Sequence, residues 1–95
     1  MPPPESRADR RVKRRDRAVA ALGDESANAA LDLLELVELA WHDCYGEVTP
    51  SEEIVDDILL VSRGTLGGMI SAAHLAVIDS RDLKVAANAL RSGTR

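Results

Sequence analysis

The sequence predicts an all-α fold, a small bundle of four to five helices with a basic N-terminal arm. With 95 residues, of which 45% are apolar, the chain has room for one small domain and one core. Aromatic residues make up only 2%, so the core consists of aliphatic side chains, which suit helix packing better than a β-sandwich. No window alternates polar and apolar residues as a half-buried strand does.

Helix-breaking and helix-capping residues divide the chain into segments. After the N-terminal arm they predict four helices, at about residues 26–45, 50–63, 65–78 and 80–92. The arm is expected to be partly disordered, or helical over residues 6–22. In the helical form Val12 and Val19 would give it only a thin apolar seam.

The clearest local signal lies between Thr49 and Glu52. It predicts Thr49 as the N-cap of a helix, Pro50 at the first helical position, and Glu52 as the residue that completes a capping box. We expect this helix to end near Arg63, with Gly64 in the left-handed conformation after it.

Charge is segregated along the chain. Residues 1–20 hold seven basic and three acidic residues, whereas residues 21–95 hold five basic and thirteen acidic residues. The sequence therefore predicts a basic N-terminal arm, residues 1–23, and an acidic helical domain, residues 24–95. The residues expected to contact a polyanion or an acidic partner are Arg7, Arg10, Arg11, Lys13, Arg14, Arg15 and Arg17.

Three destinations for this arm are open. Clustered arginines neutralise the phosphates of a nucleic acid, although here no aromatic side chain is interleaved to stack on bases. The arm can also stay solvated and disordered. Alternatively it lies on an acidic arc of its own or a neighbouring chain, formed by Glu52, Glu53, Asp56 and Asp57.

Helical spacing sorts the side chains of the helix at 26–45, which we expect to be central. One broad apolar arc contains Leu33, Leu34, Leu36, Val37, Ala40, Trp41 and Cys44. The opposite, acidic arc contains Asp32, Glu35, Glu38 and His42, and Leu31 and Leu39 lie within this acidic arc. Cys44 is the only cysteine, which excludes an intrachain disulfide, and its place on the apolar arc predicts a buried structural thiol.

The segment from Gly64 to Ile78 contains no acidic residue, lysine or arginine. A helix that is uncharged all round is normally covered on both sides. In a chain this small the second covering layer comes either from another copy or from the rest of a monomer. Small residues one turn apart would let two backbones approach closely. The expected self-association residues are Leu66, Gly67, Ile70, Ser71, His74 and Ile78.

Two carboxylate pairs with one-turn spacing, Glu35 with Glu38 and Glu53 with Asp56, lie on consecutive helices. Such pairs point the same way and can hold Mg²⁺ between helices. Over roughly residues 35–57 this spacing resembles the all-α MazG-type nucleotide pyrophosphohydrolases, and the resemblance implies magnesium-dependent nucleotide hydrolysis with these four ligands. Leu34 stands where that family usually has a further Glu. The ordinary alternative is a solvated acidic face.

The leading hypothesis is a small, non-enzymatic interaction or regulatory module without a cofactor. It is expected to be a homo-oligomer that uses the basic arm to contact an acidic partner. Magnesium-dependent hydrolysis and nucleic-acid binding through the arm are the alternatives. No apolar stretch has the roughly 20 residues of a membrane span, and no apolar signal region follows the N-terminal charges, so the cytoplasm is the expected location.

Overall fold

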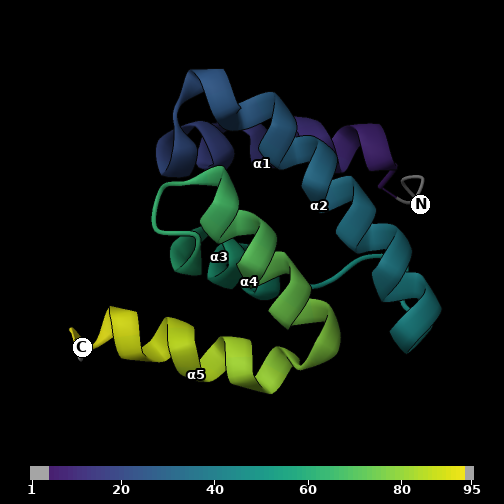
Figure 1. Ribbon diagram of the computed structural model, residues 1–95. Coiled ribbons are helices and arrows are strands. Elements are labelled where there is room, and N and C mark those ends of the chain that lie inside the picture. The colour runs from purple at the N-terminus through teal and green to yellow at the C-terminus, as the bar shows by residue number, and fades with distance from the viewer. Residues whose placement is uncertain (1–4, 94–95) are drawn as a thin grey trace.

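The computed structural model describes residues 5–93, so that residues 1–4, the start of the predicted arm, and residues 94–95 lie outside the described range. The described chain consists of five α-helices and contains no strand (Figure 1). They are α1 (Arg7–Leu22), α2 (Asp24–Tyr45), α3 (Glu52–Val61), α4 (Leu66–Ile78) and α5 (Ser80–Arg91). The predicted all-α bundle is confirmed, and the N-terminal segment takes the helical one of its two expected forms.

Each helix packs against at least two others. Figure 1 shows α1 and α2 as a hairpin that turns at Gly23, whose φ of +89° favours glycine. Helix α4 lies beside α2 and runs in the same direction, α3 lies behind α4, and α5 crosses below both. The two longest described helices therefore form one side of the bundle, and the C-terminal helices form the other.

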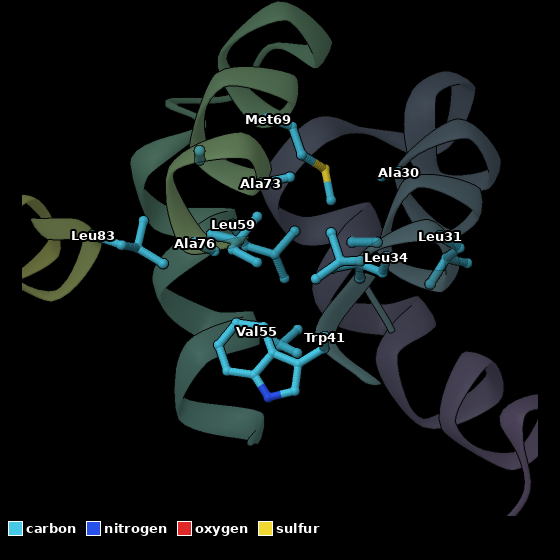
Figure 2. Close-up of a cluster of buried hydrophobic side chains, with 14 of the residues drawn as sticks. Ala30, Leu31, Leu34, Trp41, Val55, Leu59, Met69, Ala73, Ala76 and Leu83 are labelled. Atoms are coloured by element: carbon cyan, nitrogen blue, oxygen red, sulfur yellow. The ribbon is translucent and has the colours of Figure 1, made fainter. Parts of the chain in front are cut away.

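The core is built mainly from aliphatic side chains, including many alanines, together with Met69 and Trp41 (Figure 2). Its largest fully buried members include Leu31, Leu34, Ile58, Met69 and Leu83. Small side chains are completely buried where helices meet and let the helix axes approach closely: Ala18, Ala27, Ala30, Ala76 and Ala87. Because Ala18 belongs to α1, that helix is packed into the bundle and does not extend from it as a free arm.

The N-terminus of α3 differs from the prediction. Ser51 is the N-cap, and its hydroxyl accepts a hydrogen bond from the backbone N–H of Ile54 at 3.3 Å. Pro50 precedes the helix and is buried. The hydroxyl of Thr49 is instead directed at the carboxylate of Glu38 in α2. The capping box predicted at Thr49 is therefore wrong, because this hydroxyl has a charged partner far away in the sequence.

The covered face of α2 is also rotated from the predicted arc. Leu31, expected among the acidic residues, is only 2% exposed, whereas Leu36, expected in the core, is 60% exposed. The reason is that α1 packs over the acidic side of α2. The prediction of a buried Cys44 is wrong: this thiol is exposed, and it lies in the last turn of α2, past Trp41, the final α2 residue that is buried.

Candidate functional site

An apolar groove runs between α2 and α4. Its α2 wall consists of Ala29, Leu33, Leu36, Val37 and Ala40, and its α4 wall consists of Leu66, Ile70, Ala73, His74 and Val77. Two adjoining depressions of about 310 and 280 Å³ make up the groove and share Leu33, Leu36 and Ile70. The lining residues within the described chain include one acidic residue, Asp32 at one end, one histidine, His74, and no lysine or arginine.

The parallel course of α2 and α4 explains why the groove is continuous. On each helix the wall residues recur every three or four positions, so they stay on one side along the axis. Tyr45 lies at the C-terminal end of the groove, where its hydroxyl donates a hydrogen bond to the carbonyl of Val77 at 2.9 Å. The Tyr45 ring packs on Trp41 with 4.4 Å between ring centroids. The hydrogen bond from Tyr45 to Val77 connects the C-terminal ends of α2 and α4.

The groove and the adjoining outer side of α4 are open to solvent. Leu36, Ile70 and Ile78 are 60%, 58% and 64% exposed. The expected self-association residues lie together on this side: Gly67, Ile70, Ser71, His74 and Ile78 are exposed, and Leu66 is half-buried. Four residues of the α2 wall, Leu33, Leu36, Val37 and Ala40, were placed on the apolar arc of α2 from the sequence. The sequence did contain a sign that part of this arc is exposed, because the apolar arc of α2 is wider than a single packed face needs.

Opposite this surface, the α1–α2 interface contains a buried ionic cluster: Arg10, Arg14, Glu38, Thr49 and Glu52. Arg10 donates to both Glu38 oxygens, with an Nη2–Oε1 distance of 3.1 Å. Arg14 donates from Nη1 to Glu38 at 2.9 Å and from Nη2 to Glu52 at 2.7 Å. The hydroxyl of Thr49 donates to Glu38 at 2.8 Å. The cluster therefore joins α1 to α2, to α3 and to the loop between them.

The carboxylates of the buried ionic cluster are held in the charged form. Burial by itself raises the pKa of Glu38, but hydrogen bonds from Arg10, Thr49 and Arg14 outweigh it, so this pKa lies below its ordinary value. Burial also opposes ionisation of Glu52, yet hydrogen bonds from Arg14 and Arg17 lower its pKa to about 2. The expectation that Glu38 faces solvent is wrong: its side chain is 2% exposed.

The remaining α1 cations also bind carboxylates of their own chain. Arg11 pairs with Asp32 at 2.8 Å and with Glu35. Three others follow the same pattern in the described chain: Arg7 with Glu38, Lys13 with Glu5 and Glu52, and Arg17 with Glu52 and Asp56. Arg15 differs, because it donates to the amide oxygen of Asn28 at 3.0 Å.

This placement bears on the residues expected to contact a polyanion. Arg10 and Arg14 are 6% and 2% exposed, so they face the interior of the bundle and not a partner. Of the acidic arc considered as a destination for the arm, Glu52 and Asp56 do pair with α1. The charges of α1 are thus largely used within the chain.

The other half of that arc, Glu53 and Asp57, pairs with basic side chains of α5. Asp57 was expected to face solvent but is completely buried. Its Oδ2 lies 2.6 Å from Nζ of Lys84, and Arg91 donates to its Oδ1 at 2.7 Å. Lys84 also pairs with Glu53 at 2.6 Å. These contacts raise the pKa of Lys84, chiefly through the hydrogen bond to Asp57, and they attach α5 to α3.

The four carboxylates of the magnesium alternative do not converge. Each contacts a different basic group: Glu35 contacts Arg11, Glu38 contacts Arg10 and Arg14, Glu53 contacts Lys84, and Asp56 contacts Arg17. Within residues 5–93 no group of three or more His, Cys, Asp or Glu side chains is arranged to hold a metal ion. The carboxylates act here as partners of arginine and lysine.

Comparison of the chain with protein-family models, with curated proteins and with solved structures gave no match. None of the helices in the described part of the chain is both long and apolar enough to cross a membrane. The function of the chain is therefore inferred from the surfaces described above.

Proposed function

We propose that this chain is a non-enzymatic interaction module whose binding surface is the apolar groove between α2 and α4. The observation that carries the proposal is the composition of that groove: nine of its wall residues are hydrocarbon side chains of two parallel helices. Val37 and Ala73 are buried, whereas Leu36 and Ile70, which line both depressions, are 60% and 58% exposed. An exposed apolar surface of this kind is the usual sign of a protein-binding site. We place its action in the cytoplasm, as expected for a chain with one cysteine.

The distribution of charge supports this choice of surface. The titratable groups on the α1 side are engaged with each other, which gives them a structural role in attaching α1. The groove side has few charges, and the ion pair that borders it is the one between Asp32, at one end, and Arg11 of α1. A partner that buries this side would release water from aliphatic surface without breaking an ion pair.

The proposal changes the role first expected for the basic segment. An acidic partner was predicted for the N-terminal arm, and acidic groups of the chain's own α2 and α3 occupy that position. In our proposal α1 holds α2 in place, and α2 together with α4 binds the partner.

A photo-crosslinking amino acid, p-benzoylphenylalanine, tests the proposal when it replaces one residue at a time in the native host. At Leu36, which is 60% exposed in the groove, it is expected to give a discrete covalent adduct upon irradiation. The matched control is Val85 of α5, which is 68% exposed but lies away from the groove. An absence of adduct at Leu36, or the same adduct at both positions, contradicts the proposal.

A further inference from the structure

We propose that the partner in the apolar groove is helix α4 of a second copy of this chain. This inference rests on the proposed function and names the occupant of the same site. In the resulting dimer each copy inserts the outer side of its α4, formed by Gly67, Ser71, His74 and Ile78 and called here the α4 ridge, into the groove of the other.

Charge is the first argument for this occupant. Of the five described helices, α4 is the one without an Asp, Glu, Lys or Arg. A charged side chain that enters an aliphatic groove without a partner loses its hydration at a cost of several kcal/mol. The α4 ridge can enter without such a loss. Since each chain carries a net charge of −4, contact through an uncharged side also keeps the acidic groups of the two copies apart.

Position and length are the second argument. The α4 ridge lies next to the α4 wall of the groove, on the same side of the molecule, so one copy presents both parts. A two-fold axis then makes two equivalent contacts and closes the assembly as a dimer. The groove from Ala29 to Ala40 is about 17 Å long, and the 13 residues of α4 span about 20 Å. The ridge and the groove therefore match in length.

The two glycines of α4 provide the third argument. A Cβ on Gly68 would lie 2.0 Å from the carbonyl oxygen of Ser62, so the fold of a single chain requires this glycine. A Cβ on Gly67 would meet no described atom within 4 Å. Glycine is less favourable than alanine in a helix by up to about 1 kcal/mol, and nothing in the described part of the chain requires a glycine at Gly67. Close approach of a second backbone at the ridge accounts for it.

Sedimentation velocity tests the dimer. The wild-type chain is expected to sediment as a dimer that dissociates on dilution. Ile70→Glu places a carboxylate in the groove and is expected to raise the dimer Kd by at least about 100-fold. The matched control, Val85→Glu, adds the same charge at an equally exposed site on α5 and is expected to leave the Kd unchanged. Both variants should keep the helical circular dichroism of the wild type, since both sites are exposed.

A disulfide test places the ridge in the contact. In a Cys44→Ser background, a mixture of Ser71→Cys, in the ridge, and Leu36→Cys, in the groove, is expected to form a covalent heterodimer under mild oxidation at least about tenfold faster than a mixture of Ser71→Cys and Val85→Cys, because the contact raises the effective thiol concentration. Equal rates for the two mixtures overturn the inference, as does a wild-type dimer that Ile70→Glu leaves intact.

The outcomes separate this inference from the proposed function. A chain that stays monomeric near 1 mM, the limit of weak binding, while p-benzoylphenylalanine at Leu36 crosslinks to a different protein, overturns the second copy but supports the groove as a binding site. A monomeric chain without an adduct overturns both. An adduct with twice the mass of the chain supports both.

Discussion

Arg10 and Glu38 form a two-point ion pair inside the α1–α2 interface, in which Nη2 and Nε of the arginine donate to the two carboxylate oxygens. The two side chains are only 7% and 2% exposed. Val12, which was expected to lie on the apolar seam of the same helix, is 77% exposed. The attachment of α1 thus depends strongly on charged groups, and its contribution to the fold should respond to substitution and to pH.

We expect Glu38→Ala to lower the free energy of unfolding by about 3 kcal/mol or more, because it leaves Arg10 and Arg14 buried without their shared carboxylate. Glu38→Gln keeps the shape and one acceptor oxygen and should cost less. Urea denaturation followed by circular dichroism measures both. Asp16→Ala, on the exposed side of α1, is the control and should stay within about 0.5 kcal/mol of the wild type. Equal losses for Glu38→Ala and Asp16→Ala would show that the cluster adds no stability.

Stability is expected to fall in acid through Glu52. Its pKa in the folded chain is about 2, below the ordinary 4.5. The ionised form is therefore favoured by folding, and its contribution is complete above pH 4.5 and lost as the pH falls towards 2. The carboxylate is 38% exposed, so solvent screening limits this contribution to about 1 kcal/mol. Urea denaturation between neutral pH and pH 3 measures the loss, and Glu52→Gln should flatten the profile. A profile that this variant leaves unchanged would contradict the assignment.

The helices could be predicted from the sequence because their ends depend on nearby residues. Gly46 has a φ of +71° and Gly64 a φ of +84°, the positive values that their positions directly after the predicted helices lead us to expect. The absence of strands between residues 5 and 93 agrees with the lack of alternating patterns in the sequence. Local signals of this kind suffice for the class of fold and for most helix boundaries.

The burial of Glu38 and Asp57 could not be predicted in the same way. A helical projection assigns a carboxylate to the polar side, but it does not show whether water or a basic helix covers that side. Arg10 is 28 positions from Glu38, and Arg91 is 34 positions from Asp57. Such pairs form only when tertiary packing brings the helices together. The charge segregation between residues 1–20 and the rest was the available signal, and it favoured contact between the two parts.

The apolar groove was missed for a related reason. Leu33 and Leu36 have the hydrophobicity of core residues, and periodicity does not reveal that α2 uses its Leu31 and Leu34 side for the core. The uncharged character of α4, however, could be read directly, and it predicted a helix with two apolar sides. The structure covers one of these sides and leaves the other exposed.

The N-terminus of α3 offers a local test. Ser51→Ala should lower the free energy of unfolding by about 1 kcal/mol, because its hydroxyl accepts the hydrogen bond from the backbone N–H of Ile54. Thr49→Ser keeps a hydroxyl next to Glu38 and should have a smaller effect, whereas Thr49→Val removes that hydroxyl and should cost about 1–2 kcal/mol. Thermal and urea denaturation measure the three variants. If Ser51→Ala leaves the free energy of unfolding unchanged, Thr49 and not Ser51 is the N-cap of α3.

The adjacent glycines of α4 should respond in opposite ways to the same substitution. Gly68→Ala is expected to lower the free energy of unfolding by about 2–4 kcal/mol, because the new methyl group would overlap the carbonyl of Ser62 and force the turn between α3 and α4 to shift. Gly67→Ala adds its methyl group in open space and should leave the folded chain as stable as before or up to about 1 kcal/mol more stable, since alanine favours the helix. Urea denaturation at matched protein concentrations compares the two, and sedimentation of Gly67→Ala shows whether a single methyl group at the ridge already weakens the dimer. If both substitutions destabilise the chain equally, the close approach of Gly68 to Ser62 is not what distinguishes these glycines.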